Sequence, residues 1–402
     1  MRILLVAMGS SIHTARWIDQ ISDQGWDIHL FPSMDLHISQ DLRNLTIHDC
    51  VMHDPNIDSS VRQCGAWPWP FPFRGRGRVD LNLKRLRRLP IPLLIANRSR
   101  RLARVIRKIR PDIVHSMEIQ HAGYLTLDAK RELGNAFPIW FVSIWGSDIY
   151  YFGRFREHAE RIRAVLANCN YYNCECHRDV ALARTFGFKG KVFPAMPIAG
   201  FDLPRVTQFR EAGAVSARRL ILLKGYQTWA GRAIVGLRAI ALCAGHLNNY
   251  RVAIYSASPD VTEAATLVSQ TTGIPIEFIP FSSHDDMLRL HGRARIHIGL
   301  SITDGISVSF LEAIVMGAFP IQSCTACADE WIIDGQTGLI VPPEDPELIA
   351  AAIRRAVSDD ALVDNAAEIN MKLARERLDY AAIKEQVVSM YQEIWKDNLQ
   401  SR

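Results

Sequence analysis

SITDGISVSFLEAIVMGAFPIQSCTACADEWIIDGQTGLIVPP, residues Ser301 to Pro343, is the stretch of the chain that decides its fold. Its pattern predicts a Gly-containing turn after a strand, then a helix, a short strand, a second helix, a turn and a third strand. Two acids, Asp304 and Glu312, bracket the first turn and helix with seven residues between them. Regular alternation of strands and helices is typical of a parallel α/β sheet.

The first turn of this stretch is a candidate ligand site. It follows an expected strand at Ile296–Leu300 and leads into an expected helix at Ser307–Met316. In an open parallel sheet, ligands bind beyond the carboxyl ends of the strands. Gly305 lets the backbone approach a ligand closely. Backbone amides at a helix N-terminus suit a phosphate, and here they belong to Ile306, Ser307, Val308 and Ser309.

The two acids fit a sugar nucleotide at this turn. Glu312, about two turns into the helix, can reach vicinal hydroxyls of a ribose, and Asp304, just before the turn, can face a sugar. The alternative is that Asp304 caps the helix and that Glu312 is an ordinary solvated helix residue. Spacing alone leaves both interpretations open.

Similar alternation runs through the whole chain. Strands are expected at Ile3–Ala7, Ile28–Phe31, Leu45–His48, Ile113–His115, Ile139–Ile144, Tyr171–Asn173 and Lys191–Phe193. Further strands are expected at Leu220–Lys224, Arg251–Tyr255, Ile276–Ile279, Ile296–Leu300, Phe319–Gln322 and Leu339–Val341. Most are continuous apolar runs, as parallel strands covered on both faces require. Helices with one apolar face are expected at Thr14–Gln24 and Pro346–Val357.

Length and composition agree with two soluble α/β units. A chain of 402 residues fits two domains of about 200 residues each. Pro194–Ser216, which carries Pro194, Pro197, Gly200 and Pro204, is the expected boundary. No apolar run approaches the roughly 20 residues that span a bilayer. The N-terminal residues favour a buried strand over a signal peptide, so we expect a cytoplasmic protein.

The eight cysteines do not form a small disulfide framework. Cys169, Cys174, Cys176 and His177 cluster, and Cys324 and Cys327 form a CxxC pair. A zinc site is conceivable, but no second CxxC stands at finger spacing. We therefore expect buried or free thiols and no metal.

The segment from Ser301 onward resembles the retaining family 4 glycosyltransferases of GT-B fold. That family carries a Glu-Gly-Phe-Gly turn, then Leu-Glu-Ala, a Gly before a short strand, and an Asp-Gly-x-x-Gly turn. The corresponding residues here are Asp304-Gly305-Ile306-Ser307, Leu311-Glu312-Ala313, Gly317 and Asp334-Gly335 with Gly338. The resemblance implies that Glu312 binds the donor ribose, that Asp304 contacts the donor sugar, and that the amides of Ser307 and Val308 approach the diphosphate. Asp304 is one methylene shorter than the family's Glu, and Ser307 replaces its second Gly.

Two cations are candidates for the leaving diphosphate. The family has an Arg after the first C-terminal strand and a Lys about five residues later. Here Lys224 ends that strand and Arg232 follows eight residues later, so the order of residue types is reversed. A departing diphosphate needs compensating positive charge. Lys224 is the first candidate and Arg232 the second; the alternative is a pair of surface charges.

The N-terminal half resembles the family more loosely and supplies the candidate acceptor residues. Gly9, Ser10 and His13 lie between the first strand and helix, His115 ends a strand, and Asp148 closes the segment Ile144–Asp148. In that segment Trp145 stands where the family often has His. Asp148 and His115 are candidates for acceptor or sugar contacts. The alternative is a capping Asp and a His satisfied within the fold.

One segment is strongly basic. Residues 74–110 contain fourteen Lys and Arg and one acid, whereas the net charge of the whole chain is only +5. An aromatic-proline loop at Trp67–Phe73 precedes it, and Leu93–Arg110 is expected to be a basic amphipathic helix. This combination favours docking on an anionic membrane surface. Nucleic acid is the competing polyanion, but no nucleic-acid motif accompanies the segment. The remaining alternative is an ordinary helix with a solvated basic face.

Together these observations predict a GT-B α/β protein with two Rossmann-like domains facing across a cleft. Residues 1–203 are expected to bind the acceptor and 204–379 the nucleotide sugar, with 380–402 a helix that crosses back to the first domain. The expected activity is retaining transfer of a sugar from a nucleotide diphosphate, with a UDP-sugar as co-substrate and no cofactor, in cell-envelope glycan or glycolipid synthesis on the inner face of the membrane. A nucleotide-sugar epimerase of GT-B fold and a non-catalytic, membrane-docked glycan-binding subunit are the alternatives.

Overall fold

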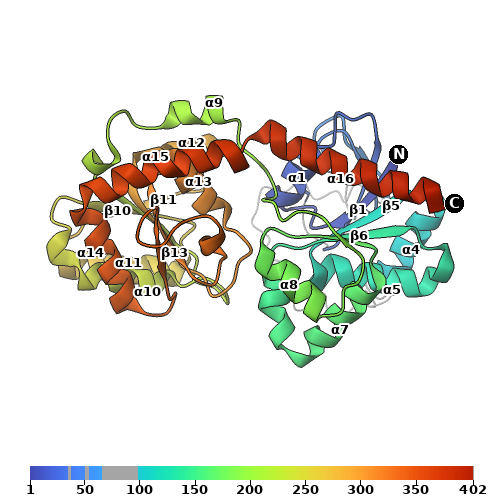
Figure 1. The fold of residues 1–402 in the computed structure, drawn as a ribbon, viewed down its shortest axis with the longest axis horizontal. Coiled ribbons are helices and arrows are strands. Elements are labelled where there is room, and N and C mark those ends of the chain that lie inside the picture. Colours follow the sequence, from blue (N-terminus) through green and yellow to red (C-terminus); the bar gives the residue numbers. More distant parts are fainter. Residues whose placement is uncertain (35–37, 50–53, 66–97, 402) are drawn as a thin grey trace, which may run out of the picture.

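The computed structural model describes residues 1–34, 38–49, 54–65 and 98–401, which form two α/β units (Figure 1). The first sheet has the strand order β4-β3-β2-β1-β5-β6-β7-β8, and the second has the order β11-β10-β9-β12-β13-β14. All the paired strands are parallel. The prediction of two doubly wound α/β units is confirmed.

The first unit has helices on both faces of its sheet. Its strands are β1 (Arg2–Ala7), β2 (Asp27–Pro32), β3 (Thr46–Ile47), β4 (Arg62–Gln63), β5 (Ile113–Met117), β6 (Ile139–Ser143), β7 (Tyr171–Asn173) and β8 (Lys191–Val192). Its helices are α1 (Ile12–Asp19), α4 (Arg98–Ile109), α5 (Tyr124–Leu133), α6 (Ser147–Tyr150), α7 (Arg156–Asn168) and α8 (His177–Thr185).

The second unit repeats this arrangement. Its strands are β9 (Leu220–Lys224), β10 (Arg251–Tyr255), β11 (Ile276–Ile279), β12 (Ala294–Gly299), β13 (Phe319–Ser323) and β14 (Leu339–Val341). The helices from the linker onward are α9 (Leu203–Val206), α10 (Ala233–Leu242), α11 (Pro259–Thr272), α12 (His284–Arg293), α13 (Val308–Met316), α14 (Pro346–Ser358), α15 (Asp360–Arg377) and α16 (Tyr380–Ser401).

The predicted strands coincide with observed ones, and the differences are local. The edge strand β4 was not predicted, because its two residues, Arg62 and Gln63, show no apolar run. The second helix expected in the Ser301–Pro343 stretch is only a 3₁₀ turn at Ala328–Glu330. The helix expected at Thr14–Gln24 begins and ends earlier, at Ile12–Asp19, and the Ser11 side chain caps its start.

The chain passes between the two units twice, and the two passages are hydrogen-bonded to each other. Phe201 N donates to Leu378 O at 2.8 Å, and Tyr380 N donates to Phe201 O at 3.0 Å. A Cβ on Gly200 would lie 2.7 Å from the Tyr380 Cα, so only glycine fits this contact.

Helix α16 packs along the first unit, as Figure 1 shows for the red helix that ends at the C-terminus. Five of its apolar side chains share a core with β1 and α1; they are Ile383, Val387, Met390, Tyr391 and Ile394. The indole N–H of Trp17 donates to the Tyr391 hydroxyl at 2.9 Å. The last helix thus belongs to the core of the unit in which the chain begins.

The described part of the basic segment is a helix packed on the first sheet. Helix α4 buries Leu102, Ala103, Ile106 and Ile109 in a cluster with strands β1, β2 and β5. The apolar face of this amphipathic helix therefore lies in the core and is not available to a membrane. The exposed basic residues of α4 are Arg100, Arg104, Arg107 and Lys108, and the exposed Arg110 directly follows the helix. The Trp67–Phe73 loop lies outside the described residues. Among those described, no helix has the length and apolarity needed to cross a membrane.

Candidate active site

The turn between β12 and α13 lies against the first unit. A Cβ on Gly305 would lie 2.6 Å from a carboxylate oxygen of Glu175, and a Cβ on Gly146 would lie 1.8 Å from the Gly305 nitrogen. The two units therefore meet backbone to backbone at these glycines. The predicted close approach at Gly305 exists, but its partner is the first unit rather than open ligand space. Ile306 N, also expected at the diphosphate, faces Glu175 Oε2 at 3.5 Å.

Lys224 ends β9 beside the start of α13. Its Nζ donates to Ser307 Oγ at 3.2 Å, and Ser307 Oγ is 2.9 Å from Ser309 Oγ. Ser307 is the N-cap residue of α13, but its side chain caps no amide of the first turn. The helix N-terminus, including the amides of Val308 and Ser309, and the Lys224 ammonium thus lie together. Both groups favour a bound phosphate.

Arg232 is engaged elsewhere. Its Nε pairs with Glu344 at 2.9 Å, and its Nη1 donates to carbonyl groups of its own loop, including Gly231 O at 2.9 Å. In this structure the guanidinium thus pairs with a largely exposed carboxylate and holds the loop before α10. Its diphosphate role stays a prediction.

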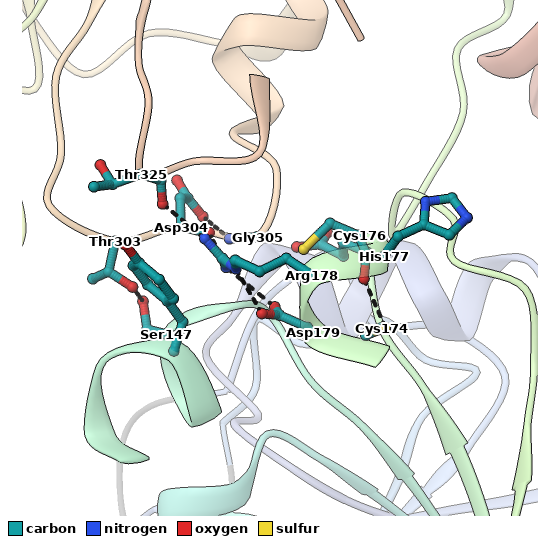
Figure 2. A network of polar contacts seen from close by, with 12 residues as sticks. Ser147, Cys174, Cys176, His177, Arg178, Asp179, Thr303, Asp304, Gly305 and Thr325 are labelled. Carbon is teal, nitrogen blue, oxygen red and sulfur yellow. Dashed lines mark hydrogen bonds and ion pairs between the residues drawn. The ribbon is translucent and has the colours of Figure 1, made fainter. Parts of the chain in front are cut away.

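Asp304 lies at the contact between the units (Figure 2). Its carbonyl oxygen accepts a hydrogen bond from Arg178 Nη2 at 2.7 Å, and its carboxylate accepts one from Gly305 N at 3.0 Å. Burial raises the pKa of Asp304, and the Lys224 charge partly opposes this rise. The Lys224 charge, the Gly305 backbone hydrogen bond and the Arg178 charge thus all favour the ionised carboxylate against the effect of burial.

Glu312 is almost buried, on the inner side of α13. Its Oε1 pairs with His284 Nε2 at 2.9 Å, and Oε2 lies 3.9 Å from His291 Nδ1. Burial raises its pKa, but the hydrogen bond from His284 and the charges of both histidines outweigh burial, so the pKa lies below its usual value. Glu312 is thus an ionised hydrogen-bond acceptor and is unsuited to donating a proton.

His13, in helix α1 of the first unit, lies near Lys224 and Glu312. The turn Gly9–Ser10 leads into α1, where Ser11 Oγ accepts from His13 N at 3.2 Å. Burial, Arg16 and Lys224 lower the pKa of His13 to about 4, while Glu312 acts in the opposite direction. Its Nδ1 is buried and has no hydrogen-bond partner among the described residues. The imidazole is therefore neutral near pH 7, with a buried and unpaired Nδ1.

His115 and Asp148 are not available to an acceptor, which corrects two predictions. His115 is fully buried, and its ring nitrogens pair with Tyr391 Oη at 2.7 Å and Ser143 Oγ at 2.8 Å. The carboxylate of Asp148 accepts from Ile119 N at 2.6 Å and Trp145 N at 2.9 Å. Burial and the nearby Glu118 raise the pKa of Asp148 to about 7. Both residues hold the fold together.

Sequence reasoning missed Glu175, Arg178 and His284. Burial and then Asp304 raise the pKa of Glu175 well above its usual value. Arg178 donates to Thr325 O and Asp304 O from the second unit, at 2.9 and 2.7 Å (Figure 2). The position of Glu175, just beyond the carboxyl end of β7, is a signal that could have identified it.

A cavity of about 380 Å³ lies between the units next to these residues. Its lining includes Ile12, Arg16, Glu175, His284, Val308 and Leu311. Lys224 lies close to Asp304 and His13, and Glu312 lies close to His13, at the carboxyl edge of the second sheet. Of the predicted donor-site residues, Val308 lines the cavity, whereas Lys224, Asp304 and Glu312 do not.

The fold is a two-domain α/β fold of GT-B type. The model of glycosyl transferases group 1 matches residues 237–373, and the glycosyl transferase 4-like model matches residues 2–61 and 77–174. The two models cover successive parts of the chain, which is a GT-B glycosyltransferase. No curated protein matches the chain.

Solved structures share the fold at low sequence identity. Sucrose-phosphate synthase (tll1590) from Thermosynechococcus elongatus has a TM-score of 0.68 at 15% identity, covering 99% of this chain and 100% of its own. Anabaena Alr3699/HepE in complex with UDP and glucose has a TM-score of 0.66 at 14% identity, covering 98% and 100%. The same Anabaena protein has a TM-score of 0.65 when in complex with UDP-glucose, at 13% identity and the same coverage.

Proposed function

We propose that this enzyme transfers a sugar, with retention of anomeric configuration, from a UDP-sugar to an acceptor hydroxyl, as the family 4 enzymes do. The observation that carries the proposal is the convergence of Lys224, the α13 N-terminus and ionised Glu312 at one sheet edge. In this arrangement the diphosphate lies at Lys224 and α13, and the ribose hydroxyls donate to Glu312. The complexes of the Anabaena protein with UDP and UDP-glucose support the choice of donor.

The proposed chemistry needs no metal or other cofactor. As the bond to the anomeric carbon breaks, negative charge grows on the diphosphate, and Lys224 and the helix N-terminus stabilise it. The departing phosphate oxygen then draws the proton of the acceptor hydroxyl, which attacks from the same face. Asp304 and the neutral imidazole of His13 are proposed to contact the sugars, together with the Gly9–Ser10 turn.

Hydrolysis of the donor tests the stereochemical course without knowledge of the acceptor. With water as a poor acceptor, the sugar first released from an α-linked UDP-sugar should be the α anomer, followed by proton NMR before mutarotation. Initial release of the β anomer would rule out retention. Conversion of the donor to another nucleotide sugar would favour the epimerase alternative. Complete inertness, together with no thermal stabilisation by any nucleotide sugar, would favour a non-catalytic subunit.

We further propose that the acceptor is a lipid-linked or cell-envelope glycan at an anionic membrane surface. Since the apolar face of α4 is buried, attraction rests on the exposed basic face of that helix. We expect the protein to sediment with anionic but not with neutral vesicles, and salt to weaken binding because it screens these charges. As a control, charge reversal at Arg104 and Lys108 should weaken binding. Failure to sediment at low salt would contradict membrane docking.

A further inference from the structure

A group of metal-ligating side chains lies at the contact between the units, outside the proposed donor site. The thiol sulfurs of Cys176 and Cys327 and a carboxylate oxygen of Glu330 lie within 4.8 Å of one another. Cys176 directly precedes α8 in the first unit, whereas the other two residues follow β13 in the second unit. A fourth candidate ligand, the Nδ1 of His177, is 2.8 Å from Glu330 Oε2. Figure 2 shows Cys176 and His177 beside Arg178 at the start of this helix.

The fold brings together two pairs of candidate metal ligands that lie far apart in the sequence. One is the pair Cys176-His177, and the other is Cys327 with Glu330 three residues later. Glu330 is held in place because its carboxylate accepts the backbone N–H groups of His177 and Arg178 at 2.9 and 3.2 Å. Cys327 has a φ of 47°, which is uncommon for a residue with a side chain.

We propose that Cys176, His177, Cys327 and Glu330 bind one zinc ion that bridges the two units. Two thiolates with an imidazole and a carboxylate form a ligand set that zinc takes in tetrahedral geometry. Ligand atoms of such a site lie roughly 3.3–3.8 Å apart, so Cys176, Cys327 and Glu330 need only small movements to share an ion, whereas the His177 ring must turn toward the two sulfurs. The His177 ring is exposed, and it can turn its nitrogen from Glu330 to the metal.

The surroundings favour a cation. Both thiols are buried, with exposed fractions of 0% for Cys176 and 3% for Cys327, and the buried carboxylate of Asp179 lies next to them. The neighbouring cation, Arg178, is already paired with Asp179 at 2.9 Å. Zinc binding replaces the two thiol protons, which are released to solvent, and so converts neutral thiols into thiolate ligands.

A disulfide between the two cysteines fits the observations less well. A disulfide would not explain why Glu330 and His177 lie beside the two thiols. It would also require an oxidising disulfide to reach two buried sulfurs, one of which must first ionise. A small divalent cation needs no such access. Because the ligands come from both units, zinc would hold the units together beside Arg178, which contacts the Asp304 turn.

Cobalt titration of the reduced, metal-free full-length protein tests the site. We expect one equivalent of Co²⁺ to produce visible tetrahedral bands and a thiolate-to-cobalt charge-transfer band, both abolished by Zn²⁺. Cys176→Ser and Cys327→Ser should each weaken binding by at least about 100-fold. The matched control is Cys324→Ser, which removes an exposed thiol from the same loop and should leave the spectrum unchanged.

Each outcome decides between the alternatives. Absence of thiolate-to-cobalt bands in the wild-type protein, or equal bands in the Cys176→Ser/Cys327→Ser double variant, would overturn the proposal. Loss of two titratable thiols on treatment with oxidised glutathione, without any cobalt signal, would replace zinc by a disulfide. Circular dichroism of the serine variants establishes that they are folded. Because the readout is spectroscopic, it is independent of the proposed sugar transfer.

Discussion

Glu312→Gln should lower kcat/KM for the nucleotide sugar by roughly 100-fold or more. A carboxylate that accepts hydrogen bonds from two ribose hydroxyls contributes about 1.5–3 kcal/mol through each of them, and a neutral amide retains only one acceptor oxygen. The His284 hydrogen bond keeps Glu312 ionised before the donor arrives. Steady-state rates and the calorimetric Kd of UDP measure the effect, and both should worsen together.

A modified donor separates ribose binding from damage to the fold. If Glu312 holds the ribose, removing the 2′-hydroxyl from the donor should weaken binding to the wild-type enzyme strongly and to Glu312→Gln only slightly. Glu263→Ala, which removes an exposed acid from α11, is the matched control and should behave as wild type. Equal losses from donor modification in both enzymes would remove Glu312 from the ribose site.

The fold was predictable because parallel strands buried on both faces read as continuous apolar runs. Leu220–Lys224, the run that became β9, was predicted with the observed bounds, since four of its five residues are buried. Where an element is only partly buried, it shows no continuous apolar run and cannot be predicted in this way. The edge strand at Arg62–Gln63 has no apolar residue, and the turn at Ala328–Glu330 follows a left-handed Cys327 that no periodicity reveals.

The site was predictable within one segment and less so across the contact of the two units. Asp304, Ser307 and Glu312 share a turn and a helix, so their spacing alone places them together. The strand expected to end at His115 runs on to Met117, so the ring lies in the middle of β5 and faces the core rather than a ligand. The contact of Glu175 with the Asp304–Ile306 turn depends on the packing of two units, which no local pattern encodes.

Lys224→Met should reduce kcat by roughly 10²–10³-fold, the usual cost of removing one preorganised group that stabilises transition-state charge. The loss should exceed the weakening of donor binding, because the diphosphate gains charge only as the sugar departs. Rapid-mixing measurement of a single turnover isolates that step. Lys224→Arg should recover part of the rate, since it retains the charge at the end of β9.

The same substitution should also shift the pH profile, which a purely structural role would not do. Lys224 opposes the rise in the pKa of buried Asp304, so removing the ammonium should raise that pKa further. If ionised Asp304 contacts the sugar, the acidic limb of kcat/KM moves to higher pH in Lys224→Met. Arg238→Ala, at an exposed position of α10, is the control and should leave rate and profile unchanged. A rate and pH profile equal to wild type in Lys224→Met would show that the diphosphate charge is stabilised by another group.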